Sequence, residues 1–299
     1  MTVRLAASGK VFLAGEYAVL DPGRPALVAG IDWKMHAVAE PGARGVQIVH
    51  RPSGLLWDGG QAPAELRFAA RAALLAMAFC RKPDGVRISF EDDLSREGRK
   101  LGLGGSAAAC VLAVRAVCAL ADRRSGEDEI LALAVAAHWA EQGGMGSGAD
   151  VAAAALGGIL EVRSRIAWQS AGEVMALPAD RVAASRPIDV RRVAVPLQLR
   201  LLLVDAGEPA NTRLLVREVM RAFRSSHRSW PGRALSPRRR ELRENRAAPA
   251  AATAPWSLPS ATMPVIARKR RCARTFRCFA SPRPDPASRA GRRPVSGYS

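Results

Sequence analysis

The chain has 299 residues, of which 48% are hydrophobic, and a formal net charge of +18. That length is enough for one large or two smaller domains with a buried core. The five cysteines show no paired spacing, and no apolar run is long enough to span a membrane, which argues against a disulfide-stapled or membrane-spanning protein. We find no signal segment either, and therefore expect a protein of the reducing cytoplasm.

The net charge is unevenly distributed. Residues 224–299 contain 18 basic and 3 acidic residues, whereas the first 223 residues contain 27 basic and 24 acidic residues and are nearly neutral. Ten of the 20 prolines also lie in residues 224–299. Because this composition buries too little apolar surface to offset the entropy of ordering, we expect a disordered tail there.

Hydrophobic periodicity and turn residues predict the elements of the first 223 residues in chain order. Strands are predicted at 2–6, 10–13, 26–39, 45–50, 86–90 (half-buried), 159–163, 193–195 and 199–204. Helices are predicted at 65–79, 106–121, 125–142, 149–156 and 212–223, with a turn at 22–25 and a polar loop at 91–100. This order of strands and interleaved helices indicates an α+β fold.

The stretch from Lys100 to Ala109 joins a glycine-rich loop to the start of an apolar helix. Gly102, Gly104 and Gly105 add little side-chain bulk, and the free N–H groups and positive dipole of a helix start suit a phosphate. Ser106 is placed to cap the helix, to ligate a metal, or both. A tight turn into a buried helix explains the same residues, and the loop is not a Walker A motif, because no Lys-Ser/Thr pair follows it.

Four ordered motifs resemble those of the GHMP kinase family: residues 6–20, 100–109, 146–158 and 205–216. Within the family, Gly-Glu-Tyr-Ala at 15–18 is similar to the branch whose acceptor is 5-phosphomevalonate. Gly105 stands where the loop of that branch usually has a serine. The resemblance implies an S5-like ATP-binding domain at 1–165 and a ferredoxin-like domain, here truncated, at 166–223.

The resemblance implies transfer of the ATP γ-phosphoryl group to phosphomevalonate, with Mg²⁺ as cofactor. Asp150 matches the family's catalytic aspartate, as a base or as an orienting charge, and Lys10 matches a lysine that faces the transferred group. A dipole-stabilised helix aspartate and a solvated lysine are the structural alternatives. The implied ATP-binding residues are Lys100, Gly102, Leu103, Gly104, Gly105, Ser106 and Ala107.

Further assignments concern the metal and the acceptor. Ser106 and Glu141 are the implied Mg²⁺ ligands, although Glu141 stands nine residues before Asp150 where mevalonate kinases have about eleven, so an exposed helix-end carboxylate is an alternative. Tyr17 and Ser147 border the implied acceptor site. The four histidines show no zinc spacing, and we expect His138 to be structural. Mevalonate is the alternative acceptor.

Residues 224–299 contain nothing similar to the family's third glycine-rich motif. We therefore expect a truncated second domain and weak or absent kinase activity. One hypothesis is that the chain from about Ser225 is read in a shifted frame, which translation of the gene in the other frames tests. A non-catalytic remnant with a basic tail that binds nucleic acid is an alternative, disfavoured by the scarcity of aromatic residues. The sequence does not determine the oligomeric state.

Overall fold

The computed structural model describes residues 1–21, 23–81, 85–92, 94–96, 99–121, 123, 125–194, 201–204 and 275–276. For residues 96, 99, 100, 275 and 276 it describes the backbone alone. The predicted helix at 212–223, the motif at 205–216 and the tail, apart from the backbone of residues 275 and 276, therefore lie outside the described residues.

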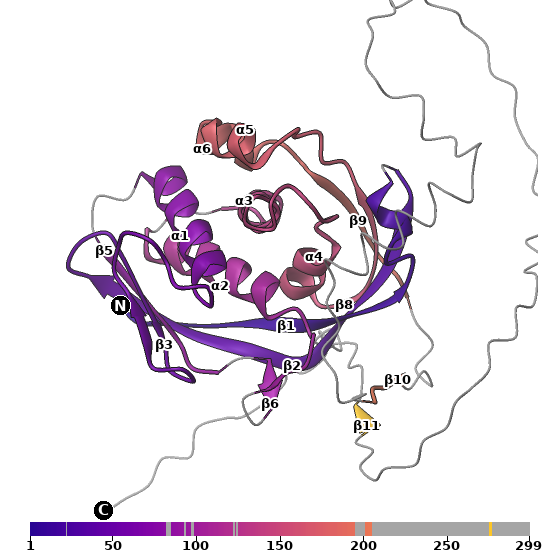
Figure 1. Ribbon diagram of the computed structural model, residues 1–299, viewed down its shortest axis with the longest axis horizontal. Coiled ribbons are helices and arrows are strands. Elements are labelled where there is room, and N and C mark those ends of the chain that lie inside the picture. The colour runs from indigo at the N-terminus through magenta and orange to yellow at the C-terminus, as the bar shows by residue number, and fades with distance from the viewer. Residues whose placement is uncertain are drawn as a thin grey trace, which may run out of the picture. The chain divides into compact units, whose positions relative to one another are not determined.

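A seven-stranded sheet forms the framework (Figure 1). Its strands are β1 (Val3–Ala14), β2 (Pro25–Gly42), β3 (Val46–His50), β4 (Leu55–Trp57), β5 (Gly85–Phe90), β8 (Gly158–Ser164) and β9 (Ile188–Arg192). The order is β4-β3-β5-β2-β8-β9, with β1 paired along β2, and every pairing is antiparallel except that of β3 with β5. The long strand β2 holds β8 at its first half and β5 at its second half.

Helices cover one face of this sheet (Figure 1). They are α1 (Arg67–Cys80), α2 (Gly105–Leu120), α3 (Glu127–Glu141), α4 (Ala149–Leu156), α5 (Ala171–Ala176) and α6 (Ala179–Ala183), with a 3₁₀ turn η1 at Ala18–Leu20. Two small ladders complete the described elements: β6 (Ser95–Arg96) with β7 (Arg99–Lys100), and β10 (Leu201–Leu202) with β11 (Thr275–Phe276).

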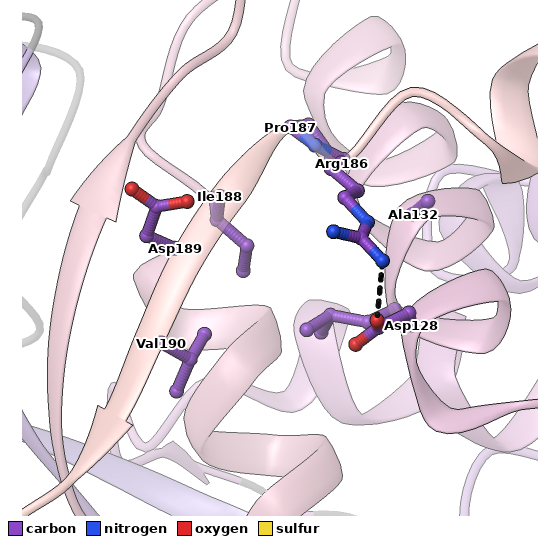
Figure 2. A pocket seen from close by; sticks show the side chains of 8 residues that line it. Asp128, Ala132, Arg186, Pro187, Ile188, Asp189 and Val190 are labelled. Atoms are coloured by element: carbon purple, nitrogen blue, oxygen red, sulfur yellow. Dashed lines mark ion pairs between the residues drawn. The ribbon is translucent and has the colours of Figure 1, made fainter.

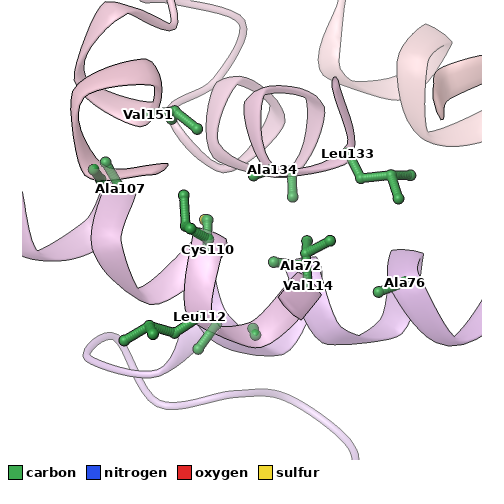
Figure 3. Packing of buried hydrophobic residues seen from close by; sticks show 14 of the residues in the cluster. Ala72, Ala76, Ala107, Cys110, Leu112, Val114, Leu133, Ala134 and Val151 are labelled. Atoms are coloured by element: carbon green, nitrogen blue, oxygen red, sulfur yellow. The ribbon is translucent and has the colours of Figure 1, made fainter. Parts of the chain in front are cut away.

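The core is centred on α2, which lies among α1, α3 and α4 (Figure 3). Ala107, Cys110, Leu112 and Val114 of α2 are completely buried. Small side chains dominate the facing helices, so their backbones approach closely, and burial of each larger apolar side chain contributes about 1.5–3 kcal/mol. A helix start on α2 is thereby held rigidly over the sheet.

A close approach of glycines positions α4. A Cβ on Gly30 of β2 would lie 2.6 Å from the Cα of Gly157 and 2.7 Å from the carbonyl oxygen of Ala153. Only glycine at position 30 lets α4 and the chain after it rest directly on the sheet. The same contact sets the height of the residues that open α4.

Most sequence-based predictions of elements are confirmed, and the α+β class with them. Helix 149–156 has the predicted bounds, and the helices predicted at 65–79, 106–121 and 125–142 are shifted by one or two residues at their ends. The strands predicted at 2–6 and 10–13 are one strand, β1, whose pairing with β2 shifts register between Ser8 and Gly9.

Three predictions of local structure were wrong. Residues 91–100, predicted as a polar loop, contain the β6–β7 ladder. The strand predicted as half-buried at 86–90 is β5, in which every residue except Arg87 is buried. The strand predicted at 193–195 lies earlier in the chain, as β9 (Ile188–Arg192). Pairing with β8, and not local apolarity, determines where this strand forms. The short helices α5 and α6 had no periodic signal long enough to be recognised.

Candidate functional site

The glycine-rich loop ends at the first turn of α2, as predicted. Gly104 is the N-cap in the left-handed region (φ 85°), no side chain caps this helix, and no acidic residue lies in its first turn. Ser106 is the second residue of the helix, so its predicted role as N-cap is wrong. A helix start without a side-chain cap or its own acid leaves N–H groups and the positive dipole for an external anion.

Lys10 of β1 lies against this loop. Its backbone N–H donates to the carbonyl oxygen of Leu103 at 2.8 Å. A Cβ on Gly104 would come within 2.6 Å of Lys10 Cγ, so the lysine stem occupies the space that a side chain there would need. Lys10 Nζ is 5.1 Å from the centroid of the Phe12 ring. The side chain of Lys100 lies outside what the structure describes.

The start of α4 repeats the backbone arrangement of α2 with different chemistry. Gly148 is its N-cap with φ 77°, and Asp150 is its second residue. The carboxylate Oδ1 accepts a hydrogen bond from the backbone N–H of Val151 at 2.9 Å, and the side chain is 22% exposed. The other oxygen, Oδ2, has no hydrogen bond among the described residues.

His138 of α3 lies between these two helix starts. Its Nε2 is 3.0 Å from Ser106 Oγ and 3.7 Å from Asp150 Oδ2, and its side chain is 3% exposed. Its ring stacks at an angle of 38° on Phe68, with centroids 5.1 Å apart. The sequence-based interpretation of His138 as structural missed this position. The sequence did contain one signal: His138 stands twelve residues before Asp150, close to the eleven-residue spacing expected for the metal-binding glutamate.

Burial determines the charge state of His138. Loss of solvent lowers its pKa, nearby Lys10 lowers it further, and the carboxylate of Asp150 opposes both. The imidazole is therefore neutral at pH 7. Nε2 of Gln142, an amide nitrogen that can only donate, lies 3.5 Å from the same ring nitrogen. Nε2 of His138 is therefore best placed as an acceptor.

The carboxylate of Glu141 forms ion pairs with two arginines. Its Oε2 is 2.6 Å from Nε of Arg71 and its Oε1 is 3.4 Å from NH1 of Arg67, and only 8% of its side chain is exposed. The alternative of an exposed helix-end carboxylate is therefore wrong. Both oxygens face arginines, so in this arrangement the carboxylate is not free to bind a metal.

Comparisons with known proteins show which family the chain is similar to. Residues 67–158 match the model of the GHMP kinases N terminal domain. The chain is 34% identical over 260 residues to the phosphomevalonate kinase of Streptomyces sp. (strain CL190), an alignment that covers 76% of this chain. The chain is therefore similar to GHMP kinases, and its residues 67–158 match their N-terminal domain. It spans 66% of that relative's length, a little under two thirds.

Solved structures show the same GHMP kinase fold. The Streptococcus pneumoniae phosphomevalonate kinase in complex with phosphomevalonate and AMPPNP superposes with a TM-score of 0.62 at 22% identity, covering 73% of this chain and 67% of that one. The Methanococcus jannaschii mevalonate kinase superposes with a TM-score of 0.55 at 18% identity, covering 74% and 66%. Because enzymes with different acceptors share the fold, the fold does not determine the acceptor.

The two residues expected at the acceptor differ in their surroundings. Ser147 is 7% exposed and its Oγ accepts a bond from the N–H of Ala149 at 3.4 Å, in the turn that opens α4. Tyr17 is half-buried at the start of η1, and burial, followed by the charge of Glu16, raises its pKa. Among the described residues, no hydrogen bond joins Tyr17 to the phosphate loop or to Asp150.

A pocket of about 220 Å³ lies elsewhere, between the first turns of α3 and the start of β9 (Figure 2). Asp128 and Arg186 face each other across it at 3.7 Å. None of the residues predicted for the kinase site lines this pocket. In the described part of the chain, no cluster of three His, Cys, Asp or Glu side chains is suited to a metal, and no helix could cross a membrane.

Proposed function

We propose that this chain transfers the γ-phosphoryl group of ATP to the phosphate of 5-phosphomevalonate, giving 5-diphosphomevalonate and ADP. The observation that carries the proposal is the convergence of Lys10, the glycine-rich start of α2 and the Asp150 start of α4. The similarity to the Streptomyces phosphomevalonate kinase supports this acceptor over mevalonate.

The start of α2 is proposed to hold the phosphates of ATP. Its first N–H groups point out of the helix, and Gly102, Gly104 and Gly105 let the backbone approach the phosphate oxygens. Lys10 adds a cation against Gly104, and Lys100, Leu103 and Ala107 complete the predicted binding segment. Phosphoryl transfer depends mainly on such positioning and charge neutralisation.

Mg²⁺ fits a site between Ser106 and Asp150. Both offer hard oxygen ligands, both are close to the same nitrogen of His138, and a protein usually holds Mg²⁺ with one or two carboxylates together with phosphates of the substrate. When bound, the ion would neutralise charge on the phosphate oxygens. Glu141 is proposed to stay with its arginines, in place of the metal role expected for it.

His138 is proposed to set the direction of the Ser106 hydroxyl group. If neutral Nε2 accepts the hydroxyl proton, the oxygen lone pairs of Ser106 point away from the imidazole and are available to a cation. Asp150 is proposed as an orienting charge more than a base, because a phosphate acceptor is already ionised near neutral pH. Tyr17 and Ser147 remain proposed neighbours of the acceptor.

The decisive experiment measures ADP formation by the full chain with phosphomevalonate and, separately, with mevalonate. We expect slow ADP formation with phosphomevalonate, because nothing in residues 224–299 is similar to the family's third glycine-rich motif. ADP formed with mevalonate alone would overturn the proposed acceptor. Direct binding of Mg·AMPPNP, measured by calorimetry, tests the nucleotide site without turnover. We expect Ser106→Ala to weaken that binding, and a chain that does not bind the nucleotide would contradict the whole site. Cytoplasmic location stays a prediction from cysteine usage.

A further inference from the structure

Two cysteines meet at the end of α2 opposite the phosphate loop. Cys80 is the last residue of α1 and Cys118 lies two residues before the end of α2. Their sulfur atoms are 3.6 Å apart, and the thiol of Cys80 donates a hydrogen bond to Cys118. The residues are separated by 38 positions in the sequence, so only the packing of α1 on α2 brings them together.

We propose that Cys80 and Cys118 form a peroxide-responsive dithiol that closes into a reversible intrachain disulfide. The proposal does not depend on the kinase assignment, because neither cysteine belongs to the phosphate loop or to the Ser106–His138–Asp150 group. It assigns a modification site to a pair that sequence spacing gave no reason to connect.

Cys118 is suited to be the attacking thiolate. The hydrogen bond from Cys80 lowers the pKa of Cys118 to about 7, with help from Ser125 and the charge of Arg123, against the opposing effects of burial and Glu129. The guanidinium of Arg123 is fixed over the Phe79 ring at 3.7 Å and donates to the carbonyl oxygen of Phe79. A substantial fraction of Cys118 is therefore thiolate near neutral pH.

Exposure and distance allow the reaction. Cys80 is half-buried and Cys118 is 3% exposed, so a small oxidant reaches the pair from the side of Cys80. A disulfide needs the sulfur atoms at about 2.05 Å, an approach of roughly 1.5 Å that side-chain rotation in the last turns of two helices can supply. Helix ends are the parts of helices that yield most readily.

The chemistry balances with hydrogen peroxide as the oxidant. The Cys118 thiolate attacks one peroxide oxygen, an S–O bond forms, the O–O bond breaks, and the departing hydroxide takes a proton to become water. The sulfur of Cys80 then attacks the sulfur of the Cys118 sulfenic acid. The S–S bond forms, the S–O bond breaks, and the oxygen leaves as a second water with the proton of the Cys80 thiol.

Cys110 provides a matched control on the same helix. It is completely buried, its thiol donates to the carbonyl oxygen of Phe68 at 3.4 Å, and burial raises its pKa well above the ordinary value. A thiol of this kind is inert toward peroxide. Cys272 and Cys278 lie outside the described residues, so the assay must identify each cysteine by its own peptide.

The experiment treats the folded full chain with peroxide, blocks remaining thiols, and maps tryptic peptides without reduction. Cys80 lies in peptide 72–81, Cys118 in 116–123 and Cys110 in 101–115, so each has its own fragment. We expect a linked 72–81/116–123 species, lighter by two hydrogen atoms than its parts, that disappears on reduction. Absence of this link in the folded chain, or its formation only in urea, overturns the proposal.

Three variants sharpen the result. Cys110→Ser should form the same link, and loss of the link in this variant would contradict the assignment. Cys80→Ser keeps a hydroxyl donor but removes the second sulfur, so Cys118 should stop at sulfenic acid and be trapped by dimedone. Cys80→Ala removes the donor too, so the pH midpoint for alkylation of Cys118 should move upward from about 7. An unchanged midpoint would show that Cys80 does not activate Cys118.

Discussion

The starts of α2 and α4 share one backbone conformation but differ in charge. Each follows an N-cap glycine in the left-handed region, Gly104 or Gly148, and each carries its polar residue at the second helical position, Ser106 or Asp150. The start of α4 has its own carboxylate, which accepts from the N–H of Val151. The start of α2 has no acidic residue and has Lys10 beside it instead.

The difference assigns the two helix starts complementary roles. A helix start that already holds a carboxylate has its dipole partly neutralised, whereas one that faces a lysine attracts an anion from outside. His138 lies between the two polar residues and contacts both groups without adding a charge. The pair therefore presents a phosphate-attracting side and an acidic, cation-attracting side to the same space.

Removal of the charge at α4 should have the largest effect. We expect Asp150→Asn to reduce turnover with phosphomevalonate by about 10³-fold, because a preorganised charge at the transferring group is lost. Binding of AMPPNP in the absence of Mg²⁺ should change little, because the α2 start is intact. Steady-state kinetics together with calorimetry measure the two effects. Near-normal turnover in Asp150→Asn or in Asp150→Ala would show that the active centre lies elsewhere.

A side chain at the N-cap of α2 should weaken nucleotide binding at the other helix start. In Gly104→Ala the new Cβ would meet Lys10 Cγ at 2.6 Å and strain a left-handed residue by about 1–2 kcal/mol. We expect about 10-fold weaker AMPPNP binding, because the lysine is displaced.

The neighbouring glycine is the control for that substitution. A Cβ on Gly105 would meet only the Met35 Cε, at an ordinary 3.7 Å. Gly105→Ala should therefore weaken AMPPNP binding much less than Gly104→Ala does, and it should gain about 0.5–1 kcal/mol of stability in urea unfolding. Equal losses of affinity in both variants would mean that displacement of Lys10 is not the cause.

Substitution of His138 tests how the two helix starts are connected. We expect His138→Leu to weaken binding of Mn²⁺ with AMPPNP, measured by electron paramagnetic resonance, by roughly 10-fold, because the Ser106 hydroxyl loses its acceptor. His138→Gln retains an acceptor and should recover most of the affinity. If Leu and Gln weaken Mn²⁺ binding equally while both variants stay folded, His138 fills space and does not orient Ser106.

Glu141 tests whether any nearby carboxylate would serve as well as Asp150. Glu141→Gln should lower turnover only a few-fold. It should nevertheless cost about 1–2 kcal/mol of stability, since two half-exposed arginines lose their partner. Urea unfolding and kinetics on the same preparation separate the two. A loss of turnover as large as that of Asp150→Asn would restore Glu141 as a metal ligand.

The sequence alone predicted most of this framework. Helical periodicity located α1, α2, α3 and α4, and the glycines before Ser106 and Asp150 located both helix starts, because these signals are local. The family resemblance, confirmed by the comparisons, added the proposed roles of Lys10 and Asp150. Their roles as site residues stay predictions.

Only the tertiary structure decided which side chains meet. His138 was interpreted as structural and Glu141 as a metal ligand, yet the packing of α3 brings His138 to Ser106 and Asp150 and gives Glu141 to Arg67 and Arg71. The same holds for Cys80 and Cys118, which lie 38 residues apart. Periodicity shows which face of a helix is buried, but partners depend on the rotation and height at which helices pack, and those are set by long-range contacts such as Gly30 against Gly157.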